Sequence, residues 1–257
     1  PGPACGGESP SKPDGSSYTC TFSEDFTSST LDSSKWMVAT TAQSGFTGGE
    51  CYVNTPNNIS ISDGSLHLTS RVEPAPFVCH SPYGDFKTTQ TGASVLSYGR
   101  FAQTYGRFEF RARFPSADTP DFDSALWMYP QNPAYGGWPN SGEIDVAEWL
   151  GSGYGNQRVF PSVHYAGQTS ASTGMNCTVP DADTAFHRYA VNWTATTMYF
   201  YYDDQLCFQH SWAPNAPLIA PKPFDKAFDL VMTQTGRKSA VAGSSLTMDV
   251  DWVRAWK

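Results

Sequence analysis

One stretch decides the fold of this chain: Tyr105-Gly106-Arg107-Phe108-Glu109-Phe110-Arg111-Ala112-Arg113-Phe114. Apolar residues at the even positions from 108 onward alternate with charged residues at the odd positions. Successive side chains of a β-strand point to opposite faces, so this period of two predicts a half-buried strand. An amphipathic helix would need a period near 3.6, which the stretch lacks.

The same alternation recurs between turn signals along the rest of the chain. It is found in four further segments, at residues 59–61, 66–68, 198–202 and 246–252. No stretch shows convincing helical periodicity, and there is no internal repeat or linker. We therefore predict an all-β protein made of two packed antiparallel sheets. Residues 21–257 are expected to form a single domain, and residues 1–20, rich in Pro, Gly and Ser, an N-terminal arm over it.

The bulk composition narrows the class of partner. Hydrophobic residues make up 39% of the 257, charged residues 16% and aromatic residues 14%, which fits a packed domain and not a disordered chain. The formal net charge is −8 without a long basic run, so nucleic acid is not an expected partner. No stretch approaches the ~20 apolar residues of a membrane span. A neutral polymer suits the acidic balance.

Six cysteines are scattered through the sequence without a C-x-x-C pair. Zinc sites need closely spaced ligands, so three disulfides in an oxidising compartment are the simpler interpretation. Six cysteines allow 15 pairings. We favour pairing in sequence order: Cys5 with Cys20, Cys51 with Cys79, and Cys177 with Cys207. On this ground we expect a secreted protein, with Pro1 near a mature end.

Three carboxylates crowd one segment, Gly142-Glu143-Ile144-Asp145-Val146-Ala147-Glu148-Trp149. On a regular strand Glu143 and Asp145 share a face, whereas Glu148 points away. A single β-bulge around Val146-Ala147 returns Glu148 to the shared face. Carboxylates this close raise one another's pKa values, so at least one is expected to hold a proton near neutral pH.

This arrangement suits glycoside hydrolysis. A retaining enzyme places a carboxylate nucleophile and a carboxylic acid about 5–5.5 Å apart, and two pleats of a strand span roughly that distance. We assign Glu143 as the nucleophile, Glu148 as the acid/base, and Asp145 as the group that hydrogen-bonds the nucleophile. A solvent-facing acidic strand or a calcium site would be the alternative. Trp138, in a loop rich in Gly and Pro, is the expected sugar platform, because aromatic rings stack on sugars.

The run from Trp138 to Glu148, Trp-Pro-Asn-Ser-Gly-Glu-Ile-Asp-Val-Ala-Glu, resembles the signature of the laminarinase-like members of glycoside hydrolase family 16. Residues 105–113, 186–193 and 250–254 resemble other strands of that family. The resemblance implies a β-jelly-roll sandwich of two curved sheets with a concave substrate cleft. It also implies endo-cleavage of β-1,3-linked glucan with net retention, the same roles for the three acids, and no catalytic cofactor.

The chain departs from the family pattern near the expected cleft. Where such enzymes usually read Trp-Pro-Ala-Phe-Trp-Met, this chain has Asp123-Ser124-Ala125-Leu126-Trp127-Met128, so one cleft tryptophan is missing. Where an Asn is usual in the penultimate strand, Thr233 is followed by Gln234. Besides Trp138, four residues are expected to bind substrate: Trp127, His164, Gln234 and Glu50. Asp251, in the last strand, is at a position where family members often bind a structural calcium ion.

Several functions fit this sequence. The leading hypothesis is a secreted, monomeric hydrolase of laminarin-like β-1,3-glucan. A galactan hydrolase of the agarase or carrageenase type, or a transglycosylase, would use the same scaffold and the same acids. A non-catalytic glucan-binding protein is a third reading. Such a protein would be expected to lack one or more of the three acids, and this chain has all three.

Overall fold

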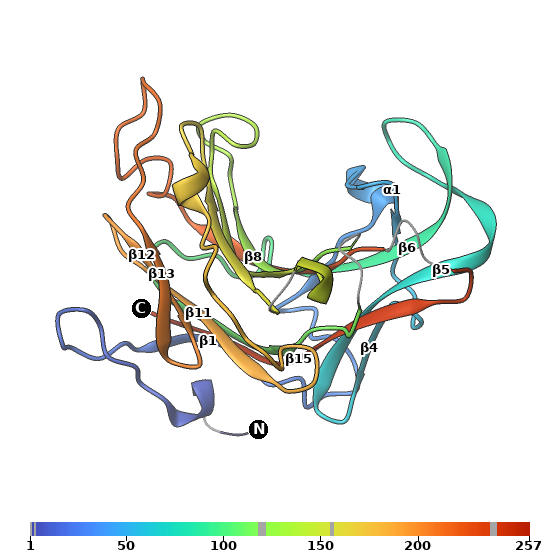
Figure 1. Cartoon of the computed structure of the whole chain (residues 1–257), viewed down its shortest axis with the longest axis horizontal. Helices are drawn as coiled ribbons and strands as arrows, with labels where there is room; N and C mark the ends of the chain where they lie inside the picture. Colours follow the sequence, from blue (N-terminus) through green and yellow to red (C-terminus); the bar gives the residue numbers. More distant parts are fainter. Residues whose placement is uncertain (1, 3, 118–121, 155–156, 237–240) are drawn as a thin grey trace.

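The strands stack in two layers (Figure 1), as the alternation predicted. The computed structural model describes residues 2, 4–117, 122–154, 157–236 and 241–257. One layer, the site layer, has in order β10 (Phe160–His164), β9 (Glu143–Trp149), β8 (Ser124–Pro130), β14 (Phe228–Gln234) and β6 (Phe86–Leu96), with β2 (Met37–Val38) also paired to β6.

The other layer, the outer layer, lies beneath the site layer in Figure 1. Its order is β5 (Ser65–Cys79), β15 (Ser245–Trp256), β7 (Gly106–Arg113), β11 (His187–Trp193), β12 (Met198–Tyr202) and β13 (Gln205–His210). Two further strands flank it, β1 (Cys20–Glu24) beside β15 and β4 (Ile59–Ser62) beside β5.

Strand β6 connects the two layers. Its first part pairs with β5 and its last residues, from Ala93 to Leu96, pair with β14. The two sheets therefore continue into each other and form one curved all-β unit. The pairings are antiparallel except for the short β3 (Cys51–Tyr52), which runs parallel to β6.

Helices are short in the described part of the chain. They are α1 (Thr41–Ser44) and the 3-10 turns η1 (Ala4–Gly7), η2 (Ser152–Tyr154) and η3 (Ser170–Ser172). The lack of helical periodicity in the sequence is thus confirmed. No helix of the described residues has the length and apolar character needed to cross a bilayer.

Strand β7, the stretch that predicted the fold, lies between β11 and β15 in the middle of the outer layer. Its apolar side chains Phe108, Phe110 and Ala112 are fully buried between the layers, as the alternation predicted. On the opposite face, however, Arg107 and Glu109 are also buried. Ion pairing between these two side chains, which the alternation alone could not reveal, makes that burial possible.

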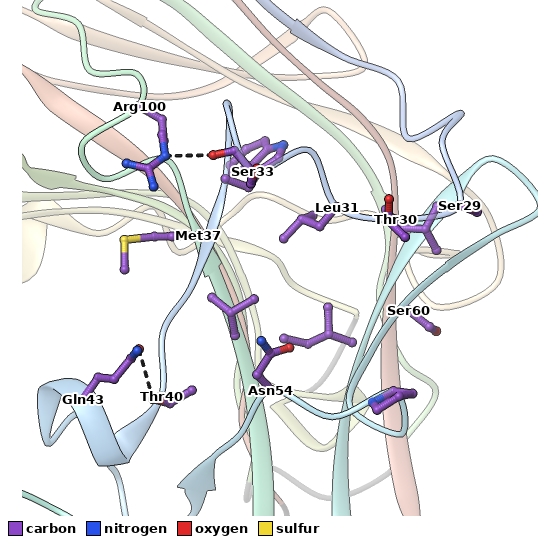
Figure 2. Close-up of a pocket in the computed structure, with 15 residues that line it drawn as sticks. Ser29, Thr30, Leu31, Ser33, Met37, Thr40, Gln43, Asn54, Ser60 and Arg100 are labelled. Carbon is purple, nitrogen blue, oxygen red and sulfur yellow. Dashed lines mark hydrogen bonds between the residues drawn. The ribbon is translucent and has the colours of Figure 1, made fainter.

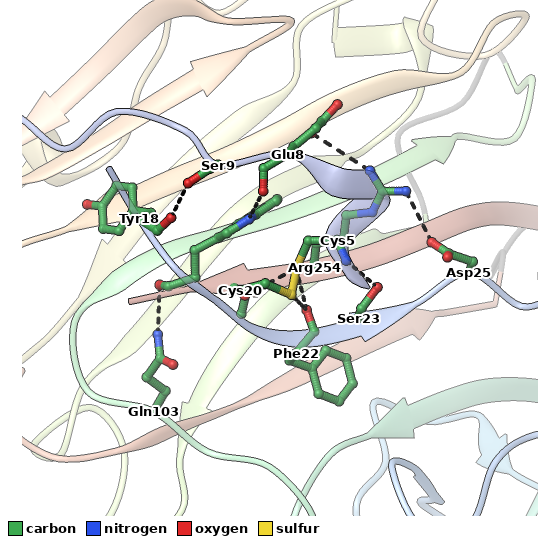
Figure 3. Close-up of a disulfide and its surroundings, with 12 residues drawn as sticks. Cys5, Glu8, Ser9, Tyr18, Cys20, Phe22, Ser23, Asp25, Gln103 and Arg254 are labelled. Atoms are coloured by element: carbon green, nitrogen blue, oxygen red, sulfur yellow. Dashed lines mark hydrogen bonds and ion pairs between the residues drawn. A yellow bond between two sulfur atoms is a disulfide. The ribbon is translucent and has the colours of Figure 1, made fainter. Parts of the chain in front are cut away.

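All three disulfides follow the sequence order that we favoured. The Cys5–Cys20 bond ties the N-terminal arm to the start of β1 (Figure 3). The arm packs against the last strand, where the Trp256 indole donates to the Glu8 carbonyl at 3.1 Å. Arg254 reaches Asp25 at 3.1 Å on the same surface. These bonds fit an oxidising compartment.

Candidate active site

The acids lie on β9, and the ladder on both sides of this strand is interrupted. Asp145 lies opposite Trp127 of β8, whereas Ala147 lies opposite the preceding residue, so Val146 has no partner in the ladder. The pairing with β10 shifts at the same place. The β-bulge predicted at Val146-Ala147 is therefore confirmed, and the acids on either side of it come to one face.

A hydroxyl from the outer layer supports this bulge. The Tyr202 side chain of β12 crosses the core and donates to the Val146 carbonyl at 2.9 Å, and both groups are buried. A bulge frees backbone groups from the ladder, and a buried carbonyl without a donor is costly. Tyr202 satisfies that carbonyl, so it helps to keep β9 in the bulged form that aligns the acids.

Tyr202→Phe should lower the free energy of unfolding by about 1–3 kcal/mol, because it leaves a buried carbonyl without its donor. We expect a lower kcat in the folded variant as well, since the bulge loses its support. Urea denaturation with an activity assay checks both effects. Tyr199→Phe on the same strand is the matched control, because that half-exposed hydroxyl makes no hydrogen bond among the described residues. Equal stability of the two variants would contradict the role of Tyr202.

The three carboxyls of β9 form a hydrogen-bonded chain. The Asp145 side chain bonds to both Glu143 and Glu148. Asp145 is 2% exposed, and burial, followed by the charge of Glu143, raises its pKa well above the ordinary value. Burial and the charge of Asp145 likewise raise the pKa of Glu148. Two carboxyls can bond only if one holds a proton, so these bonds require the cluster to be partly protonated.

Asp145 is the middle member of this chain, since Glu143 bonds to it on one side and Glu148 on the other. The two glutamates are therefore linked through a single carboxyl.

His164, on the neighbouring strand β10, lies against the middle of this chain. Its Nε2 is 2.8 Å from Asp145 Oδ2, an ion-pair distance. Its Nδ1 lies 3.1 Å from Gln168 Oε1, an acceptor, so Nδ1 carries a proton and Nε2 faces the acids. Trp138 stands beside His164 with ring centroids 5.9 Å apart, and it is 56% exposed. The structure thus brings His164 and Trp138 to the acids.

Trp127, Glu50 and Gln234 differ in how much of them a substrate could reach. Trp127 is partly exposed on β8 and its indole donates to Thr233 at 3.0 Å. Gln234 is fully buried, with Oε1 accepting from Ser124 at 2.6 Å. Glu50 is also buried, and it accepts a hydrogen bond from Tyr52.

The expected substrate contacts of Gln234 and Glu50 do not fit this structure. Both side chains lie beneath the surface. The side-chain oxygen and nitrogen of Gln234 have partners in the chain, and Glu50 accepts from Tyr52 through Oε1. Their positions in the sequence indicated correctly that they lie near the acids. A strand pattern predicts which face of the sheet a side chain is on, but not how deeply that side chain is buried. Trp127 keeps a surface that a sugar could contact.

Asp123 joins the acid cluster, and the sequence analysis gave it no role. Its side chain is hydrogen-bonded to Glu148. Burial first, and then the charges of Glu143 and Glu50, raise its pKa to about 7. One feature of the sequence could have indicated this role: Asp123 stands where the family pattern has a tryptophan of the expected cleft.

The environment of Asp251 does not fit a calcium site. Its carboxylate is paired with the Arg111 guanidinium, and a cation on the carboxylate disfavours a second one. Among the described residues, one group of potential ligand atoms lies within 4.8 Å of one another, from Glu143, Asp145 and His164. The hydrogen-bonded acid chain accounts for that closeness, and we assign no metal ion to it.

A cavity of about 780 Å³ lies between residues 29–43 and residues 54–61 (Figure 2). Its lining is mainly apolar and hydroxyl side chains, with Arg100 bonded to the Ser33 carbonyl at 2.8 Å. No residue of the acid chain lines it. We therefore do not assign this cavity as the active site, in spite of its size.

Comparisons with known proteins agree with the fold and the acids. A sequence model described as beta-porphyranase A–D, GH16 domain, matches residues 18–257. The beta-glucanase of Rhodothermus marinus is 36% identical over 186 residues, which cover 68% of this chain and 59% of the relative. The keratan-sulfate endo-1,4-beta-galactosidase of Sphingobacterium multivorum is 29% identical over 251 residues, covering 93% and 55%. The chain spans less than two thirds of both relatives.

A solved structure, that of the laminarinase from Rhodothermus marinus, matches with a TM-score of 0.73 at 28% identity, covering 93% of this chain and 97% of that one. Two continuous curved layers with three carboxyls along one bulged strand define a β-jelly-roll of the glycoside-hydrolase type. With the match over residues 18–257, the chain belongs to glycoside hydrolase family 16.

Proposed function

We propose that this chain is a secreted, monomeric endo-hydrolase of neutral β-1,3-glucan that acts with net retention. The observation that carries the proposal is the row of three carboxyls on the bulged strand β9, where Asp145 bonds to both Glu143 and Glu148. Retaining enzymes need a protonated carboxyl and an ionised one at short spacing. Because both glutamates bond to the single carboxyl of Asp145, their spacing favours retention over inversion.

In this mechanism Glu143 attacks the anomeric carbon and the glycosidic C–O bond breaks. Glu148 gives its proton to the departing oxygen, which leaves as the new hydroxyl end of the other fragment. Asp145 orients Glu143 and bonds to Glu148. In the second step Glu148 takes a proton from water, the water oxygen bonds to the anomeric carbon, and Glu143 is released. Two displacements restore the β configuration.

The charges around the acids support a neutral substrate. Among the described residues, the one basic side chain that acts on the acid chain at close range is His164. Asp123 and Glu50 add negative charge on the same side. A sulfate ester next to these carboxylates would be repelled, whereas glucose hydroxyls can donate to them.

A galactan hydrolase is the second candidate. The family description names porphyranases, and the relative from Sphingobacterium is named for keratan sulfate. The same acids would serve that chemistry, so the candidates differ in the sugar bound and not in the mechanism.

Incubation with laminarin, barley mixed-linkage glucan, agarose and porphyran separates these candidates. We expect short oligosaccharides from laminarin, with new reducing ends in the β configuration when proton NMR spectra are recorded before mutarotation. Release from agarose or porphyran alone would replace the substrate and keep the mechanism. Initial α products would overturn retention. Binding to laminarin without any product would favour the glucan-binding protein.

Trp138→Ala should raise KM for laminarin about 5–10-fold with little change in kcat, because the loss of an exposed stacking ring costs about 1–1.5 kcal/mol of binding. Trp138→Phe is the matched control, since it retains a smaller ring and should lie between the variant and the wild type. Steady-state kinetics on laminarin measure both constants. An unchanged KM in Trp138→Ala would remove Trp138 from the substrate surface.

A further inference from the structure

Asp123 is held in place by its backbone. Its N–H donates to the Thr235 hydroxyl at 2.6 Å, and its carbonyl accepts from the Thr235 N–H at 2.8 Å and from the Thr235 hydroxyl at 2.9 Å. Next to it, the Ser124 hydroxyl donates to Gln234 at 2.6 Å. Four hydrogen bonds between the start of β8 and the end of β14 therefore fix where the Asp123 side chain begins.

The carboxyl at the end of this fixed segment faces another carboxyl. Asp123 Oδ1 is closed off from solvent, and no N–H or hydroxyl donor of the described residues reaches it. Ala125 of β8 lies opposite Glu148, and Asp123, two residues before Ala125, is directed to the same face. This register brings the Asp123 carboxyl to Glu148, and the two side chains are hydrogen-bonded. Since two carboxylates repel each other, this contact is stable only when the pair holds a proton.

We propose that Asp123 is a positioning residue for Glu148: its carboxyl shares a proton with Glu148, favours the protonated form of the acid/base and fixes where that side chain lies. This inference rests on the proposed function. Asp145 also bonds to Glu148, so the acid/base lies between two carboxyls. Asp145 also serves the nucleophile, whereas the contacts of Asp123 in the cluster are with the acid/base.

Other charged groups near Asp123 also influence the protonation of the Asp123–Glu148 pair. Glu143 and Glu50 add negative charge at Asp123, while His164 adds positive charge at Glu148. Tyr52 bonds to Glu50 and stays neutral because burial raises its pKa. Of these, Glu50 provides the best comparison, because it is also a carboxyl that acts on Asp123, and its hydrogen-bond partner is Tyr52 and not Glu148.

Asp123→Asn removes one negative charge and retains the shape of the side chain. With that charge gone, Glu148 ionises more easily, so its pKa falls. Activity requires Glu148 to hold its proton, so the basic limb of the kcat/KM profile on laminarin should move to lower pH by about one unit. The acid limb should move less. Glu50→Gln removes an equal charge farther from Glu148 and should produce a smaller shift.

Carboxyl ¹³C NMR titration tests the contact without substrate. With ¹³C-labelled glutamate, the Glu148 signal is assigned by its loss in Glu148→Gln, and its midpoint should fall in Asp123→Asn. An unmoved midpoint and an unmoved basic limb, with only kcat reduced, would overturn the proposal in favour of a structural role. If laminarin is not cleaved at all, the proposed function fails, and the titration still decides whether Asp123 and Glu148 share a proton.

Discussion

Glu143→Gln and Glu148→Gln should each lower kcat on laminarin by about 10³-fold or more, while circular dichroism and the thermal midpoint stay close to wild type. A glutamine at 143 is too weak a nucleophile to form the glycosyl ester, and a glutamine at 148 has no proton to give the leaving oxygen. Glu73→Gln, a change on β5 at a partly exposed ion pair with Arg71, is the charge-matched control and should retain full activity.

The two glutamates can be told apart by adding azide to their alanine variants. In Glu148→Ala the intermediate on Glu143 persists, and azide attacks it from the face that the acid/base has vacated, giving a β-glycosyl azide. In Glu143→Ala azide takes the place of the nucleophile and gives the α product. These products are read from substrates with a good leaving group, which need no proton. Exchanged anomers would reverse the assignment, and rescue of neither variant would remove both residues from catalysis.

The sequence was enough to locate the three acids, but it did not reveal every residue that determines their protonation. The three carboxyls of β9 are close in the sequence, so strand geometry and one bulge were enough to place them on a face. Asp123 comes from another strand, and it reaches Glu148 only because Thr235 of a third segment holds its backbone. No local pattern contains that contact, since it depends on how β8 and β14 align.

The same limit explains the other differences between prediction and structure. Alternation on β7 predicted the strand and its core face correctly. It could not show that Arg107 and Glu109 on the opposite face pair with each other and become buried. Glu50 and Gln234 were predicted to contact substrate, and partners such as Tyr52 and Ser124 instead hold them beneath the surface. Charge pairing and depth are properties of the assembled layers, which periodicity does not encode.

The buried pair on β7 has a large expected effect on stability. Arg107 donates to Glu109 Oε2 through Nη2 at 2.6 Å and Nε at 2.9 Å, and to Asn192 at 3.1 Å. Glu109 is 1% exposed, and Arg188, its next cation, lies 3.6 Å away. Burial raises the pKa of Glu109 even though Arg107 lowers it. The carboxylate is therefore kept in the outer layer mainly by Arg107.

Arg107→Met should lower the free energy of unfolding by about 3–5 kcal/mol at pH 7, because it leaves a buried carboxylate without its main partner. The loss should shrink as the pH falls toward about 4. Without Arg107, the folded-state pKa of Glu109 lies further above the unfolded value, so the folded state takes up the proton first and stability is lost as pH rises through that window. Urea denaturation of variant and wild type at pH 4.5 and 7 measures the difference.

Arg107→Met/Glu109→Gln is the matched control, since it removes the arginine and the buried charge together. This double variant should recover most of the stability at pH 7, because a neutral amide costs much less to bury than an unpaired carboxylate. Its loss should also be nearly the same at both pH values. If the single variant lost less than about 1 kcal/mol, or lost equally at pH 4.5 and 7, Glu109 would not depend on Arg107, and the burial of this face would have to come from the packing of the N-terminal arm.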